Sequence, residues 1–248
     1  MSMRRFMINS RCIRDGHAVV EGEVYNHIVR VLRLGTGEPL LLADENGAVY
    51  SGTIDQVTKN CVGITISSKE TAAVSAAAGP KITICQALPK GDKTDLILQK
   101  CTELGAHDFM LFGGRRSVAK VRDDQQAGKL ERWCRITSEA ARQCGRNDVP
   151  RVSWRTNAQD AAGDSSQQLR LILWEDERER SLKQLLSAPE IPATIIVAIG
   201  PEGGFDPLEV KHFSMQGFQP VSLGSRILRT ETAGIAILAI MQYMWDGM

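Results

Sequence analysis

Two glycine-containing loops in the last quarter of the chain each follow a short apolar strand and precede a helix. The first loop, within residues 199–205, follows the β-branched run 194–197, and the second, within residues 223–232, follows residues 220–222. A glycine at such a turn lets the backbone approach a ligand without an intervening Cβ. In open α/β sheets, ligands bind beyond the strand ends. The two loops therefore predict an α/β fold with one shared pocket, although either loop alone is also explained as an ordinary turn.

The charge of the first loop limits what this pocket binds. The sequence contains neither the G-x-G-x-x-G pattern of dinucleotide sites nor the G-x-x-x-x-G-K-[ST] pattern of P-loops. Glu202 stands where a phosphate-binding loop would present N–H groups and a lysine. Because a carboxylate repels a polyphosphate, we expect a neutral or cationic ligand.

Length and composition favour two domains and give no sign of a membrane segment or a signal peptide. The chain has 248 residues, of which 43% are apolar and 24% charged, as in ordinary globular proteins. No run reaches the roughly 20 apolar residues of a membrane span, and residues 1–9 lack a signal-peptide core, so we expect a cytoplasmic protein. The six cysteines form no C-x-x-C pair and the four histidines are scattered. We therefore expect no metal site, and reduced, mostly buried cysteines.

The net charge of +1 conceals an uneven distribution. Residues 81–160 contain 15 Lys and Arg against 10 Asp and Glu, whereas residues 161–248 contain 7 against 11. RNA binding requires such a local basic excess rather than a high overall pI. The excess is equally compatible with solvated helix faces, so the charges alone leave both interpretations open.

The pattern along the chain separates a β-rich part from an alternating part. Residues 1–70 predict a small β barrel with one helix at its mouth, at about 23–34, and an Asn-Gly hairpin signal at 44–47. The uncharged, alanine-rich segment 71–80 predicts a linker. From residue 81, strands alternate with helices, which predicts a parallel sheet covered on both faces. The expected strands are 4–8, 18–21, 40–43, 49–57 and 61–67, then 82–88, 109–112, 169–174 and 194–199; the expected helices are 92–104, 126–144 and 230–245, with a capping box at Asp206.

The last helix is apolar on almost every side between residues 233 and 241. Nine residues are too few to cross a membrane, and a helix without a polar face must be buried. The helix therefore lies either in the core or in a homodimer interface.

Several strings make the sequence resemble a known family. GPEGGF and SLGSRILRTETA resemble the C-terminal signature of the SPOUT superfamily of methyltransferases, and more narrowly that of the RsmE family of 16S rRNA uridine-N3 methyltransferases. KGDK, QKCTELG and EAARQCGR are similar to the same family. The resemblance implies S-adenosylmethionine (SAM) as cofactor; its sulfonium is positive and it carries no phosphate. It also implies a PUA-like RNA-binding β barrel at 1–70, a SPOUT parallel sheet with a trefoil knot at 81–248, and a homodimer formed through the knotted region.

The implied reaction assigns roles to particular residues. The substrate would be 16S rRNA of the small ribosomal subunit, methylated at one uridine (uracil 1498 by family convention). Methyl transfer is an in-line displacement, and loss of the N3 proton leaves negative charge on O2 and O4, which arginine stabilises well. We predict Arg226 and Arg229 as uracil or phosphate ligands. Glu231 is a candidate base or an orienter of these arginines, although an acid in a first helical turn is favourable for its dipole alone.

The remaining predicted contacts fall into two groups. The predicted cofactor contacts are mostly backbone, from Leu173, Glu175, Gly200, Pro201, Glu202, Gly203, Leu223, Gly224 and Leu228. The predicted RNA contacts are exposed arginines, namely Arg5, Arg30, Arg33, Arg115, Arg116 and Arg142.

Two alternatives remain at the level of sequence. A non-catalytic RNA-binding or ribosome-assembly protein would explain the barrel and the basic residues, but not the two loops. An α/β enzyme acting on a small metabolite would explain the loops, but not the barrel.

Overall fold

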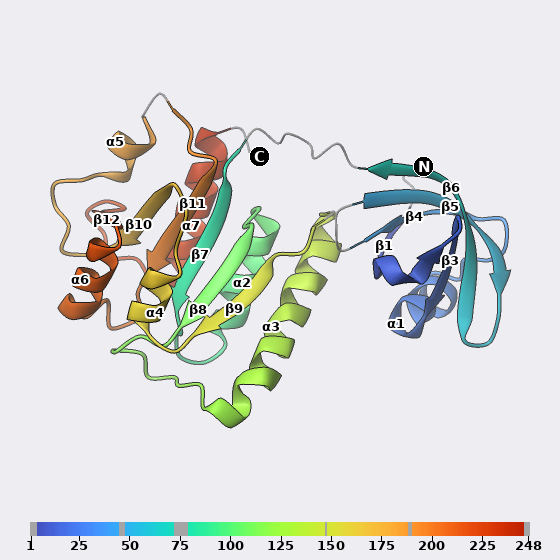
Figure 1. The fold of residues 1–248 in the computed structure, drawn as a ribbon, viewed down its shortest axis with the longest axis horizontal. Helices are drawn as coiled ribbons and strands as arrows, with labels where there is room; N and C mark the ends of the chain where they lie inside the picture. Colours follow the sequence, from blue (N-terminus) through green and yellow to red (C-terminus); the bar gives the residue numbers. More distant parts are fainter. Residues whose placement is uncertain (1–3, 45–47, 72–78, 147, 188–189, 246–248) are drawn as a thin grey trace. The chain divides into compact units, whose positions relative to one another are not determined.

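The computed structural model describes residues 4–44, 48–71, 79–146, 148–187 and 190–245 (Figure 1). The chain divides into two compact units. One comprises residues 1–76 and 141–149, and the other residues 77–140 and 150–248. The predicted hairpin residues 45–47 and most of the predicted linker, 72–78, lie outside the described residues.

The first unit contains a curled six-stranded sheet in the order β1-β4-β5-β6-β3-β2. Leucines and β-branched residues alternate along its strands; Leu40 and Leu42 in β4, and Val62 and Ile64 in β6, all point into one core. This period of two is the reason that the predicted strands form. The strands are β1 Arg5–Met7, β2 Ile13–Arg14, β3 His17–Glu21, β4 Pro39–Ala43, β5 Ala48–Val57 and β6 Cys61–Thr71.

The helix predicted at 23–34 is present in a different form. An α-helical turn, α1 (Gly22–Tyr25), continues as a π-helical segment, η2 (Asn26–Val31). Arg33 then takes a left-handed conformation with φ of 55°, which ends the helix before the predicted boundary. The pattern also gave no signal for the short η1 (Ser10–Cys12) or for the two-residue β2.

The second unit is a parallel six-stranded sheet in the order β12-β10-β11-β7-β8-β9, with helices on both faces (Figure 1). The α/β class and the parallel sheet predicted from alternation are confirmed. Its strands are β7 Lys81–Ala87, β8 Asp108–Phe112, β9 Arg151–Arg155, β10 Leu169–Leu173, β11 Thr194–Ile199 and β12 Gln219–Val221. Its helices are α2 Lys93–Glu103, α3 Asp123–Cys144, α4 Ala158–Gly163, α5 Leu182–Leu186, α6 Pro207–Met215 and α7 Thr230–Met244.

Both faces of the central strand β11 are buried, but in different cores. Ile195, Val197 and Ile199 pack with residues of α2 and α7. Ile196 and Ala198 pack with residues of α4 and α6 on the other face. A strand that is apolar at every position is the signature of such a doubly covered sheet.

The helix ends were predicted accurately, whereas three short elements were not predicted. Asp206 and Glu209 form the predicted capping box at the start of α6. Gly105 and Gly145 follow α2 and α3 with φ of 91° and 77°, as helix-ending glycines do. The pattern did not predict β9, α4 or α5, because each is only five or six residues long and lacks a sustained apolar period.

Two expectations about burial need correction or refinement. The cysteines are not mostly buried: only Cys85 and Cys101 are, because Cys134 and Cys144 lie on exposed positions of α3. Burial raises the pKa of Cys101 to about 12. Helix α7 buries one face, including Ile237 and Leu238, in the core of its own chain. Its other face is open, where Ile240, Tyr243 and Met244 are exposed.

None of the helices in the described part of the chain has the length and apolar character that a bilayer crossing requires. Among the same residues, no group of three or more His, Cys, Asp or Glu side chains could hold a metal ion.

Candidate functional site

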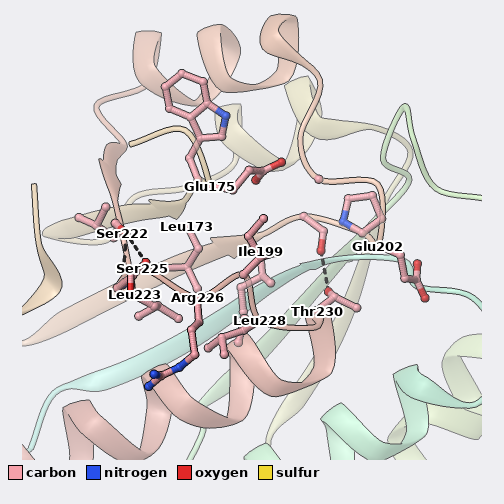
Figure 2. Close-up of a pocket in the computed structure, with 18 of the residues that line it drawn as sticks. Leu173, Glu175, Ile199, Glu202, Ser222, Leu223, Ser225, Arg226, Leu228 and Thr230 are labelled. Atoms are coloured by element: carbon pink, nitrogen blue, oxygen red, sulfur yellow. Dashed lines mark hydrogen bonds between the residues drawn. The ribbon is translucent and has the colours of Figure 1, made fainter. Parts of the chain in front are cut away.

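A cavity of about 410 Å³ lies at the carboxyl ends of β10, β11 and β12 (Figure 2). Both glycine-containing loops line it, together with the residues that follow β10. This is the edge at which open parallel sheets bind ligands. The structure brings all nine predicted cofactor residues to this cavity: Leu173, Glu175, Gly200, Pro201, Glu202, Gly203, Leu223, Gly224 and Leu228.

A buried hydrogen-bond network holds the start of the first loop. The Thr230 hydroxyl, at the start of α7, donates to the Gly200 carbonyl over 2.6 Å (dashed in Figure 2). Gln86, fully buried at the end of β7, donates through Nε2 to Thr230 Oγ1 over 2.9 Å and to the Gly200 carbonyl over 3.3 Å. Strand β7 and helix α7 are thus both hydrogen-bonded to one carbonyl of the first loop.

The far end of the first loop is held by the segment after β8. Arg116 donates through Nη1 to the Gly203 carbonyl over 3.0 Å. The backbone N–H of Arg115 donates to Glu209 Oε1 over 2.8 Å, and its guanidinium lies 3.5 Å from Asp206 Oδ1. These two arginines, which the sequence assigned to RNA, therefore also hold the loop and the start of α6.

Gly204 could not carry a side chain in this loop. It has φ of 68°, and a Cβ there would overlap the Glu175 carboxylate. Among the described residues, Glu175 has neither a hydrogen-bond nor an ion-pair partner, so the cavity contains one carboxylate available to a ligand.

The acid of the first loop, by contrast, is already paired. Glu202 Oε1 lies 2.9 Å from the Lys93 ammonium and 3.1 Å from the backbone N–H of Lys90, which donates to it. Burial opposes ionisation, but Lys93 and the backbone N–H groups prevail and hold the pKa of Glu202 below its ordinary value. Figure 2 shows this carboxylate turned away from Leu173 and Leu223.

Glu231 contacts the same lysine rather than the predicted arginines. Its Oε2 lies 3.3 Å from the Lys93 ammonium, and its side chain is only 13% exposed. Two acidic side chains, from the first loop and from the first turn of α7, thus share one cation.

Among the described residues, the second loop has only local side-chain hydrogen bonds, while its Leu223 and Leu228 pack against the core. Gly224 has φ of 122° and exchanges hydrogen bonds with the Ser222 hydroxyl, each over 3.2 Å. Arg226 lines the cavity and extends away from Thr230 and Glu202 in Figure 2. Arg229 is exposed at the start of α7 and does not line the cavity. Among the described residues, neither arginine side chain has a hydrogen-bond or ion-pair partner.

The predicted RNA-contacting arginines are all exposed, as such a role requires. Four belong to the first unit and two to the second. The first four are Arg5, Arg30, Arg33 and Arg142, and the other two are Arg115 and Arg116.

Sequence reasoning missed three residues that shape the site, namely Gln86, Lys93 and Thr230. Thr230 directly follows the signature loop, and Lys93 belongs to the quoted KGDK string, so both had a signal in the sequence. Gln86 had a weaker signal, as a polar residue near the end of a mostly apolar strand.

Comparison with known proteins now assigns the fold and the cavity to a family. The family model described as an RNA methyltransferase domain matches residues 77–242, and the one described as an RNA methyltransferase PUA domain matches residues 20–65. Ribosomal RNA small subunit methyltransferase E of Bacillus subtilis is 33% identical over 92% of this chain and 90% of its own. The chain belongs to this methyltransferase family. The Synechocystis protein of the same name is 34% identical over 96% of this chain and 78% of its own.

Solved structures agree over the whole length. Ribosomal RNA small subunit methyltransferase E from Neisseria gonorrhoeae, bound to S-adenosyl methionine, is 29% identical, covers 98% of both chains and has a TM-score of 0.83. A Legionella pneumophila protein described as a methyltransferase, in complex with SAM, is 29% identical over 98% of both chains with a TM-score of 0.84. The family and the PUA-like domain predicted from the signature strings are confirmed.

Proposed function

We propose that this enzyme transfers a methyl group from SAM to N3 of one specific uridine in 16S rRNA of the small ribosomal subunit. The observation that carries the proposal is the cavity at the strand ends, formed by both signature loops, in a chain whose family is named for methylating small-subunit rRNA. The choice of N3 and of a single uridine rests on the family resemblance of the two loops.

The cavity suits this cofactor. Its volume of about 410 Å³ lies within the range of small-molecule sites. Leu173, Leu223 and Leu228 offer apolar surface to an adenosine group, while the loop backbone offers N–H and carbonyl groups. The unpaired Glu175 carboxylate offers a negative charge to a cationic ligand. When bound, SAM supplies a methyl group made electrophilic by the positive sulfonium.

The acceptor side of the reaction falls to the second loop. The guanidinium of Arg226 is free to hold the uracil oxygens that gain charge when N3 loses its proton. Arg229, three residues later, is exposed and suits a flanking phosphate. Glu231 is the remaining candidate for orienting these groups or accepting the proton, and its pairing with Lys93 favours the orienting role.

Substrate binding and assembly complete the proposal. The domain assignment is a PUA-like RNA-binding domain at 1–70, a linker at 71–80 and a methyltransferase domain at 81–248, with the exposed arginines listed above contacting rRNA. We expect a homodimer that covers the open face of α7, where Ile240 and Tyr243 are exposed, and a trefoil knot around the two loops. An rRNA substrate would place the enzyme in the cytoplasm.

Primer extension on rRNA tests the function directly. An N3-methyl group blocks base pairing, so reverse transcription of 16S rRNA from the wild type should stop one nucleotide before the target. A strain lacking the gene should lose this stop, and the gene should restore it whereas the Arg226→Ala variant should not. A stop that persists in the deletion strain would refute the assignment.

A further inference from the structure

One lysine outside the cavity contacts both the first loop and the start of the helix that follows the second loop. Lys93 is the first residue of α2, and its ammonium contacts Glu202 of the first loop at 2.9 Å and Glu231 of α7 at 3.3 Å. Glu231 is the second residue of α7, directly after the second loop. A single positive charge therefore joins the segments that carry the two halves of the cavity.

The charges around this lysine are unbalanced without it. The two carboxylate oxygens that contact the ammonium lie within about 6 Å of each other, close enough for mutual repulsion. Glu231 Oε2 is buried and, among the described residues, has no hydrogen bond besides this ion pair. The nearest other acid on α2, Asp95, is paired with Arg132. Lys93 is thus the one cation that compensates both acids in the described part of the chain.

The same region already contains a neutral connection between the same segments. Gln86 and Thr230 hold the Gly200 carbonyl through hydrogen bonds, on the cavity side of the lysine. The ion pairs add a second connection that depends on charge. A connection of this kind can be broken and restored by changing charge alone, without altering the packed core.

We propose that Lys93 is a positioning residue for methyl transfer, which holds the first loop and the start of α7, where the second loop ends, together through Glu202 and Glu231 and so shapes the SAM site. This inference rests on the proposed function. In this arrangement Glu231 acts as one arm of the connection rather than as the proton acceptor, and Lys93 itself contacts neither substrate.

The test measures SAM affinity by isothermal titration and methyl transfer from labelled SAM to small subunits from the deletion strain. Lys93→Met should weaken SAM binding about tenfold, since the two carboxylates then repel each other across a partly exposed site. Lys93→Arg, which keeps the charge, should remain within about threefold of wild type. Lys100→Met is the matched control, because Lys100 lies on the same helix and pairs only with Glu103, and it should behave as wild type.

The double variant Lys93→Met/Glu231→Gln gives the sharper result. Removing one of the repelling charges should restore most of the SAM affinity and the rate. Loss of a merely structural contact would show no such rescue.

Each contrary outcome has one meaning. A Lys93→Met protein that is folded by circular dichroism and equals wild type overturns the inference. So does a folded double variant that binds SAM normally but has lost transfer, because Glu231 would then be the proton acceptor. If Lys93→Met does not fold, Lys93→Gln decides, and a folded Lys93→Gln protein with the SAM affinity of wild type overturns the inference. A wild type that binds no SAM refutes the proposed function itself.

Discussion

The two loops of the cavity both contain glycine and both follow a strand, but they are held differently. The first receives hydrogen bonds or ion pairs from β7, from the segment after β8, and from α2 and α7. In the second loop, among the described residues, the side-chain hydrogen bonds are those between Ser222 and Gly224; Leu223 and Leu228 pack against the core, and Ile227 is 87% exposed. The difference suggests a division of labour. We propose that the first loop is built in advance for the cofactor and that the second keeps its arginines available to the RNA.

The largest expected effect comes from the second loop. Arg226→Ala should lower the rate of methyl transfer by about 100-fold or more, as loss of one transition-state donor does. SAM affinity and the melting temperature should stay near wild type, because the side chain is exposed and unpaired. Single-turnover kinetics with saturating SAM measure the rate, and Arg226→Lys shows how much depends on the guanidinium fork. A normal rate of methyl transfer in Arg226→Ala would contradict the proposed role of the second loop in acting on the RNA.

The opposite pattern is expected in the first loop. Thr230→Val removes the hydroxyl that donates to the Gly200 carbonyl and leaves that carbonyl with the longer bond from Gln86. A lost buried hydrogen bond costs about 1–2 kcal/mol, or a few degrees of melting temperature in a protein of this size. We expect SAM affinity to fall about tenfold. Thr232→Val, at an exposed position of the same helix, is the control, and equal behaviour of the two variants would contradict this role.

Arg116 contacts the first loop and is also a predicted RNA ligand, so its substitution tests both roles. The expected effect is smaller than that of Thr230→Val. Arg116→Ala removes the donor to the Gly203 carbonyl, and because the side chain is exposed we expect a few-fold loss of SAM affinity. If Arg116 also binds rRNA, the dependence of RNA affinity on salt should become shallower by about one phosphate contact. Arg142→Ala should change only the affinity for RNA. If Arg116→Ala lowers RNA affinity but leaves SAM affinity unchanged, the bond from Arg116 to the Gly203 carbonyl does not support the first loop.

The smallest expected effect is an absence of change with pH. Glu202 chiefly raises the pKa of Lys93 above its ordinary 10.5, and the pKa of Glu202 is lowered below 4.5. The carboxylate contribution is lost only as pH falls through its lowered pKa, and the lysine contribution only as pH rises through its raised pKa. SAM affinity of the wild type should therefore be constant between about pH 6 and 9. A step in titrations across this window would show that the pair is not formed.

Local sequence was sufficient for much of the fold and for the content of the site. The strand β11 is apolar at every position after Thr194 and the capping box begins with Asp206, and both patterns act over a few neighbouring residues. The glycines of the two loops and nine of the residues that line the cavity were predictable from the strand ends and the signature strings. Short elements such as β9 and α4 were not, because their few residues lack a period and are stabilised by the sheet they join.

By itself, the sequence determined that two glycine loops end parallel strands and that a carboxylate stands in the first of them. The tertiary structure alone decided which partners these groups have. Lys93 pairs with Glu202 and Glu231 across 109 and 138 positions of chain, and Gln86 donates to Gly200 across 114. The physical reason is that a hydrogen bond or an ion pair depends on distance in space, and only the packing of α2 and α7 on one sheet brings these side chains within 3.5 Å.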